Sequence, residues 1–176
     1  MRRCWKELAP RTRIRRAVPA DIQAMMELAQ ASPGAAQWSL AQYEQLLAEA
    51  PSGESKPARQ ILVFEQEIGI QSPGVSFRPS AISGYLVAKQ IDGEWELENI
   101  VVAEQARRCG IGSRLLMKFI DQVRAKKGAS IILEVRESNR GARALYANAG
   151  FEPIGVRKNY YSTPTEDAVL YRLSLP

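Results

Sequence analysis

Residues 107–113, Arg107-Arg108-Cys109-Gly110-Ile111-Gly112-Ser113, give the clearest indication of the architecture. They follow a predicted strand, residues 95–103, and lead into residues 111–127, in which apolar side chains recur at helical spacing. Two glycines one residue apart let a backbone approach a ligand closely, and the unpaired N–H groups at a helix start attract anions. The stretch therefore predicts a strand, a phosphate-binding loop and a helix in succession.

Two other interpretations of this loop are possible. A glycine pair at a helix start is also common in ordinary loops. A dinucleotide-binding fold is the second alternative, because Glu134 lies near the spacing of about 20 residues at which such folds place a ribose-binding acid. Against it, Leu115 stands where the third glycine of that fingerprint belongs, and the preceding strand is the second arm of a hairpin with an Asp92-Gly93 turn.

Strand and helix patterns surround this unit. Ser39 with Gln42 three residues later forms a capping box, and Leu40, Tyr43, Leu46 and Leu47 are expected to line one face of the helix that follows. Residues 69–80 show no periodicity and predict a long flexible connection. Strands are predicted over 12–18, 61–64, 82–90, 95–103, 131–135, 151–161 and 169–175, and helices from about residues 19 and 39 and over 111–127 and 140–149. This order predicts an α/β fold (α+β mixed), a central mixed and mostly antiparallel sheet flanked by helices.

Composition limits the chemistry. The chain has 176 residues, a net charge of +5, two cysteines and no histidine. Without histidine, Ser-His-Asp and Cys-His mechanisms are excluded, and Cys4 and Cys109 alone cannot form a zinc site. No apolar run reaches the ~20 residues that cross a bilayer, and the first residues lack the apolar core of a signal peptide. We expect a cytoplasmic protein with no membrane partner, a basic arm over 1–11 and one domain over 12–176.

The pattern Arg-x-x-Gly-x-Gly over residues 107–112, between a strand and an amphipathic helix, resembles the cofactor-binding motif of the GNAT superfamily of N-acetyltransferases. Further motifs follow in the order of its RimI-type branch, the ribosomal-protein alanine N-acetyltransferases. They are residues 99–102, 133–139, 144–146, 150–151 and 157–161, while upstream only Trp38-Ser39 is similar to that branch.

The resemblance implies a GNAT fold that uses acetyl-CoA, with the strands over 95–103 and 131–135 splayed apart. It implies that Glu134 is the general base, through a water, that Tyr146 is the general acid, and that Tyr160 and Tyr161 bind the acceptor. The residues implied to bind the cofactor are Ile100, Val101, Val102, Arg107, Arg108, Cys109, Gly110, Ile111, Gly112, Ser113 and Asn139, with no metal. Free backbone N–H groups near Val101 and Val102 would bind the thioester oxygen.

Each of these residues also has a structural role open to it. Glu134 fits a salt-bridged core acid, Tyr146 a core aromatic residue and Asn139 a helix N-cap. Tyr160 and Tyr161 fit an aromatic pair packed on the sheet. Glu96 and Glu98, on the preceding strand, are alternative bases because other branches place the base there.

The function expected from the resemblance is acetylation of a protein N-terminal α-amine, such as the alanine of a small-subunit ribosomal protein. An α-amine has a pKa near 7.7–8.0 and is partly neutral at cellular pH, whereas lysine, near 10.4, needs more help. No direct sequence-specific contact with nucleic acid is expected. Alternatives are acetylation of lysine or a small amine, and a non-catalytic module that binds acetyl-CoA or NAD.

Overall fold

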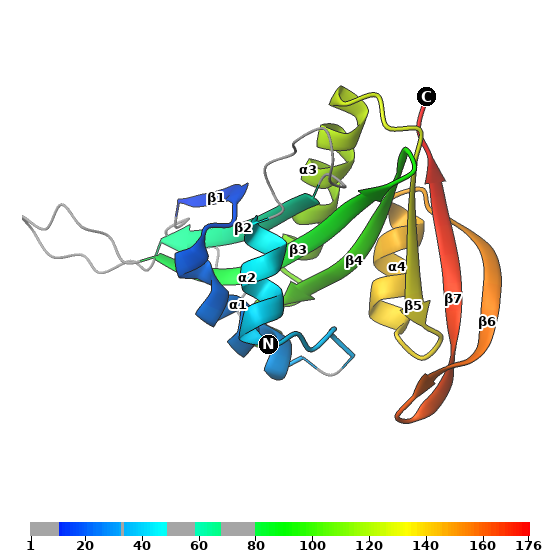
Figure 1. Cartoon of the computed structure of the whole chain (residues 1–176), viewed down its shortest axis with the longest axis horizontal. Coiled ribbons are helices and arrows are strands. Elements are labelled where there is room, and N and C mark those ends of the chain that lie inside the picture. Colours follow the sequence, from blue (N-terminus) through cyan, green and yellow to red (C-terminus); the bar gives the residue numbers. More distant parts are fainter. Residues whose placement is uncertain (1–10, 33, 49–58, 68–79) are drawn as a thin grey trace, which may run out of the picture.

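One continuous sheet organises the chain (Figure 1). The structure, a computed structural model, describes residues 11–32, 34–48, 59–67 and 80–176. Within these ranges seven strands lie in the order β1-β2-β3-β4-β5-β7-β6. The strands are β1 Thr12–Arg16, β2 Arg59–Glu67, β3 Ser80–Ile91, β4 Glu94–Val102, β5 Ser130–Arg136, β6 Glu152–Ser162 and β7 Thr165–Ser174. The helices are α1 Ile22–Gln30, α2 Leu40–Ala48, α3 Ile111–Ala125 and α4 Arg140–Asn148, with short 3-10 turns at Pro19–Asp21 and Glu104–Ala106. The predicted mixed, mostly antiparallel sheet flanked by helices is confirmed.

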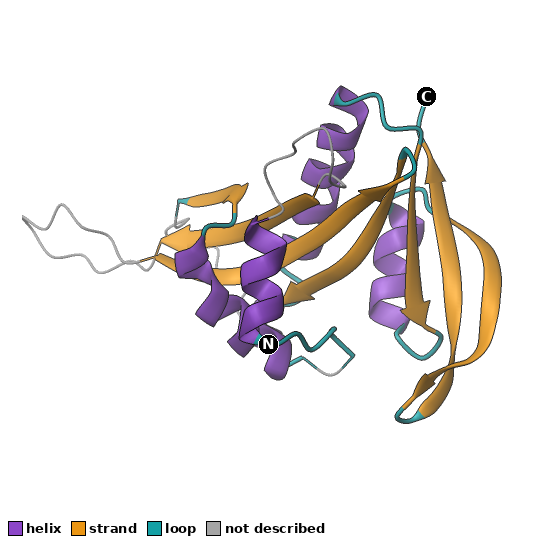
Figure 2. Cartoon of the chain, in the orientation of Figure 1, coloured by secondary structure: helices purple, strands orange, loops and turns teal. Residues whose placement is uncertain are grey.

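Helices cover both faces of this sheet (Figure 2). Side chains alternate between the faces along each strand. On β2, Ile61 and Val63 pack in the cluster with α1 and α2, whereas Leu62 and Phe64 pack in the cluster with α3. No helix within the described ranges is long and apolar enough to span a bilayer.

Several local predictions are confirmed, and two need correction. Asp92 and Gly93 both have positive φ, 48° and 88°, as a tight hairpin turn requires. Leu40 is 53% exposed and lies off the apolar face of α2. The helix predicted over 111–127 ends at Ala125, and Lys127 takes a left-handed φ of 57°. The predicted connection at 69–80, apart from Ser80 at the start of β3, and nearly all of the basic arm fall outside the described residues.

The sheet splits between β4 and β5. These parallel strands pair only at Trp95↔Ile131, Glu96↔Ile132 and Leu97↔Leu133. Beyond Leu97 a bulge places Glu98 opposite no residue of β3, because Val87 pairs with Asn99 and Ala88 with Leu97. Since a bulge bends its strand, β4 turns away from β5, and the expected splay is confirmed (Figure 1).

The two splayed strands offer different side chains to the two sides of the sheet. On β4, Ile100 and Val102 pack against the cluster that contains α3 and α4, whereas Val101 belongs to the cluster with α1 and α2. On β5, Leu133 belongs to the α3/α4 cluster, so Glu134 faces the other side. The gap therefore connects two chemically distinct half-sites.

Candidate functional site

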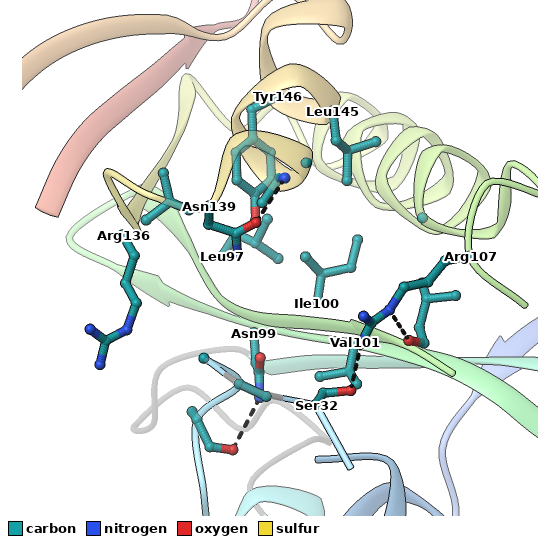
Figure 3. A pocket seen from close by; sticks show the side chains of 18 of the residues that line it. Ser32, Leu97, Asn99, Ile100, Val101, Arg107, Arg136, Asn139, Leu145 and Tyr146 are labelled. Atoms are coloured by element: carbon teal, nitrogen blue, oxygen red, sulfur yellow. Dashed lines mark hydrogen bonds between the residues drawn. The ribbon is translucent and has the colours of Figure 1, made fainter. Parts of the chain in front are cut away.

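A cleft of about 1340 Å³ opens where β4 and β5 separate (Figure 3). It brings together residues from the loop before α3, both splayed strands, the start of α4, the end of β6 and the segment between α1 and α2. Cys109 is exposed and does not line the cleft. All the other predicted site residues line it: Ile100, Val101, Val102, Arg107, Arg108, Gly110, Ile111, Gly112, Ser113, Glu134, Asn139, Tyr146, Tyr160 and Tyr161.

The loop before α3 has the backbone expected of an anion-binding helix start. Arg108 and Gly110 both have positive φ, 65° and 79°, and Gly110 is the N-cap of α3. The unpaired N–H groups of the first turn of α3 lie at the cleft, where the helix dipole favours negative charge. Arg107 holds the loop in place, because Nε donates to the Val102 carbonyl (3.1 Å) and Nη2 to Ser32 Oγ (3.2 Å).

Gly112 lies where α3 approaches α4. A Cβ added there would lie 3.4 Å from Leu145 Cδ2 and 3.8 Å from Val102 Cγ2, which is ordinary contact. The glycine is therefore not demanded by the packing of the protein. Its missing side chain instead leaves room in the cleft between the two helices.

The end of β4 supplies backbone donors to the gap. Ala103 N–H donates to the Ser83 carbonyl (2.9 Å), and donors alternate in direction along an antiparallel ladder. The N–H of Val101 therefore points to β3, and those of Ile100 and Val102 point into the gap. Free N–H groups are expected near Val101 and Val102, and of these two residues Val102 directs its N–H into the gap.

Tyr146 stands on α4 at the α3/α4 side of the gap (Figure 3). It is 5% exposed and its ring packs near Phe151 and Tyr171, with ring centroids 5.8 and 6.2 Å away. Burial, helped by neighbouring Tyr161, raises the pKa of Tyr146 well above the usual phenol value. Asn139 caps this helix, since its side chain accepts the Ala142 N–H at 3.1 Å.

Glu134 faces the α1/α2 side of the gap and has two partners on β6. Its carboxylate lies 3.1 Å from Arg157 Nη1, and its side chain is 24% exposed. A hydrogen bond to this carboxylate is the main cause of the raised pKa of Tyr160. Tyr160 in turn packs edge-on against Tyr161, with ring centroids 5.2 Å apart. Glu134 therefore forms the salt bridge expected of a structural acid, and its side chain is also accessible from the cleft.

The alternative bases on β4 also line the cleft, but basic side chains hold them. Glu98 is ion-paired with Arg59 and, at 3.0 Å, with Lys89. Glu96 lies 3.1 Å from Lys89 as well. Burial opposes the charge of Lys89, yet its contacts with the two carboxylates raise its pKa.

A bulge in β6 that the sequence analysis did not predict orients the two partners of Glu134. Opposite Asp167 the β6–β7 ladder is interrupted between Arg157 and Tyr161, and Asn159 takes a left-handed φ of 52°. Asp167 holds this bulge, accepting the Asn159 N–H at 2.9 Å and Lys158 Nζ at 2.6 Å. The bulge lies between the two partners of Glu134, so it sets where both side chains point.

We expect Asp167→Ala to lower kcat/KM for an amine acceptor about tenfold, the worth of a lost charge-assisted hydrogen bond. Without the carboxylate, the bulge no longer holds Tyr160 and Arg157 toward Glu134.

Lys158→Met is the matched control, because it removes only the exposed partner of Asp167. Asn159→Gly is expected to keep activity and Asn159→Val to lose it, since glycine adopts positive φ freely. Equal losses in Lys158→Met and Asp167→Ala would refute this role.

Comparison with known proteins gives consistent matches. The model of the acetyltransferase (GNAT) family matches residues 22–151. The chain is 40% identical over 92 residues to the ribosomal protein bS18-alanine N-acetyltransferase of Haemophilus influenzae, covering 51% of this chain and 62% of the relative. It is 35% identical over 96 residues to the Escherichia coli K12 protein of the same name, covering 53% and 65%. These matches span less than two thirds of either relative.

A solved structure extends the similarity to nearly the whole chain. The crystal structure of the ribosomal-protein-S18-alanine N-acetyltransferase from Escherichia coli is similar with a TM-score of 0.72 and 26% identity. That similarity covers 93% of this chain and 94% of the other. The overall fold is thus shared with a protein of that name.

Proposed function

We propose that this chain, which belongs to the acetyltransferase (GNAT) family, transfers the acetyl group of acetyl-CoA to the α-amine of a protein N-terminus. The observation that carries the proposal is the split between β4 and β5, which joins the start of α3 on one side to Glu134 and the β6 tyrosines on the other. A reaction between two substrates that enter from opposite sides fits this arrangement.

The residues on the α3 side suit acetyl-CoA. Gly110 and Gly112 leave the helix start open, and Arg107, Arg108 and the N–H groups of the first turn of α3 offer positive charge to phosphates. The N–H groups of Ile100 and Val102 are the donors available to a carbonyl oxygen in the gap. When bound, acetyl-CoA supplies an activated acetyl group as a thioester.

Glu134 and Tyr146 would handle the protons on the two sides of the gap. The carboxylate of Glu134 is an acceptor for a proton from the incoming amine, directly or through a water. The phenol of Tyr146 is a donor for the departing sulfur, and burial keeps it protonated. Tyr160 and Tyr161 form an aromatic wall beside Glu134, which favours a small first side chain on the acceptor.

The acceptor class rests on the named relatives and on amine chemistry. Relatives named for the alanine of ribosomal protein bS18 make a peptide beginning with alanine the first acceptor to test. Because RNA is negatively charged, an RNA-bearing particle that carries the acceptor would also be attracted by the net charge of +5 of this chain. That attraction should weaken with salt.

The pH profile tests the assignment of Tyr146. Activity on an alanine peptide is expected to rise as the α-amine loses its proton, near pH 7.7–8.0, and then to stay level to about pH 10. Because the pKa of Tyr146 is raised, its phenol holds the proton beyond the range in which free tyrosine ionises. A wild-type profile that falls near pH 9 would contradict the raised pKa of this phenol, and wild-type turnover in Tyr146→Phe would contradict its assignment as the acid.

Release of CoA thiol on addition of a peptide tests the function. A peptide beginning with alanine is expected to give steady release, and the same peptide with a blocked N-terminus is expected to give none. Strong release with lysine-bearing blocked peptides or polyamines, and none with free α-amines, would favour acetylation of lysine or a small amine. Binding of acetyl-CoA without release for any amine would favour a non-catalytic module.

A further inference from the structure

Asn99 is a buried polar residue at the wall of the cleft. It lies on β4 just past the bulge, is only 8% exposed, and lines the cleft. It is on the same side of the sheet as Glu134, because it shares the parity of Val101 on its strand. Figure 3 shows its side chain between the cleft and the segment that joins α1 to α2.

The surroundings fix which way its amide points. The Nδ2 group donates to the Ala36 carbonyl at 3.4 Å and to the Tyr85 hydroxyl at 3.3 Å. A backbone carbonyl only accepts, so the nitrogen must face Ala36. The Tyr85 hydroxyl is itself held by the Tyr43 hydroxyl at 3.0 Å. These contacts direct Oδ1 away from α1 and α2 and toward the cleft (Figure 3).

Among the described residues, the two hydrogen bonds of the Asn99 amide are both donated by Nδ2, and Oδ1 is not one of the fully buried atoms that lack a partner, so it is open to the cleft. Asn99 is only 8% exposed and lines the cleft, so a donor can reach this oxygen only from the cleft, where water can serve until a ligand displaces it. The natural donor is therefore something that enters the cleft. A carboxylate or phosphate is excluded as its partner, because both are acceptors at neutral pH.

We propose that Asn99 binds the acceptor, with Oδ1 accepting an N–H of the incoming amine or of its first peptide bond. The inference rests on the proposed function, and it adds a residue to the acceptor half-site. Glu134 and Asn99 belong to the two strands that separate at the gap, so an amine between them meets a hydrogen-bond acceptor from each strand. Asparagine suits this position better than aspartate, because a carboxylate would face the Ala36 carbonyl with no proton to donate.

Steady-state kinetics of Asn99→Ala and Asn99→Thr test the proposal. Threonine is at home in a strand and keeps a hydroxyl donor for Ala36 or Tyr85, but it lacks the carbonyl. For both variants the KM of the acceptor peptide is expected to rise about tenfold or more, as for a lost hydrogen bond to a charged group. The affinity for acetyl-CoA, measured by calorimetry, is expected to stay within about twofold and reports that the variants are folded.

Tyr85→Phe is the matched control. It removes one partner of Nδ2 and leaves the contact with Ala36, so the peptide KM is expected to change by less than about threefold. An unchanged peptide KM in both Asn99 variants overturns the proposal. So does an equal rise in Tyr85→Phe, which would make Asn99 a purely structural residue. Wild-type turnover tests the proposed function separately, and if another amine proves to be the acceptor, the same ratios are measured with that amine.

Discussion

Glu134→Gln is expected to lower turnover of an alanine peptide by about 10² or more, the typical worth of a positioned base. Glutamine keeps the size of the side chain and a hydrogen-bond acceptor for Tyr160 and Arg157, but it does not take up a proton at neutral pH. Because the loss is one of chemistry, it should appear in kcat. The affinity for acetyl-CoA, measured by calorimetry, should not change, since Glu134 lies on the other side of the gap from the helix start.

Glu98→Gln is the control for this substitution. Glu98 also lines the cleft, but Arg59 and Lys89 engage it, so its loss is expected to affect turnover far less. The Glu134–Arg157 ion pair is partly exposed, and such pairs contribute little to stability, so the thermal midpoint of Glu134→Gln should be close to that of the wild type. Near-normal turnover in Glu134→Gln together with a large loss in Glu98→Gln would place the base on β4.

Gly112→Val is expected to abolish measurable binding of acetyl-CoA in a chain that remains folded. Gly112 has ordinary helical geometry, and a Cβ there would only touch Leu145 and Val102. The two further methyl groups of valine must then enter the space that α3 and α4 leave at the cleft. Gly112→Ala should bind acetyl-CoA with intermediate affinity and be slightly more stable than the wild type, by up to about 1 kcal/mol, because alanine favours a helix over glycine.

Gly155→Ala on β6 is the matched glycine control. Nothing lies within 4 Å of the Cβ it would add, and Gly155 does not line the cleft. It is expected to leave both stability and acetyl-CoA binding unchanged. Calorimetry that finds wild-type affinity in a folded Gly112→Val variant would refute the assignment of the loop to the cofactor.

The sequence predicts best those features that depend on residues close together in the chain. The Asp92-Gly93 turn follows from local conformational preference, and the Ser39/Gln42 capping box forms as expected, with the Ser39 N–H donating to Gln42 Oε1 at 2.8 Å. The helix start at Gly110 is likewise a local pattern. The split in the sheet follows from the family resemblance rather than from periodicity, because it is not encoded within one strand, and the strand order comes only from the structure.

Features that depend on contacts between distant residues escape sequence reasoning. The bulge at Asn159 exists because Asp167 on the neighbouring strand accepts its N–H. Asn99 belongs to a recognised motif, yet its orientation depends on Ala36 and Tyr85, which are far away in the chain. Cys109 shows the converse, since this residue of the predicted cofactor motif does not line the cleft. Asparagine adopts the left-handed conformation more readily than most residues, so Asn159 is the one local signal that would have indicated the bulge.

Tandem mass spectrometry of one reacted peptide tests the central proposal most directly. The peptide begins with alanine, carries an internal lysine, and is incubated with the chain and acetyl-CoA, alongside Glu134→Gln as a control. The expected result is a single added acetyl group on the α-nitrogen of the alanine, with an unmodified lysine and at least about 10²-fold less product for the variant. Acetyl found on the lysine alone, or on neither amine while acetyl-CoA binds, would contradict the proposed function.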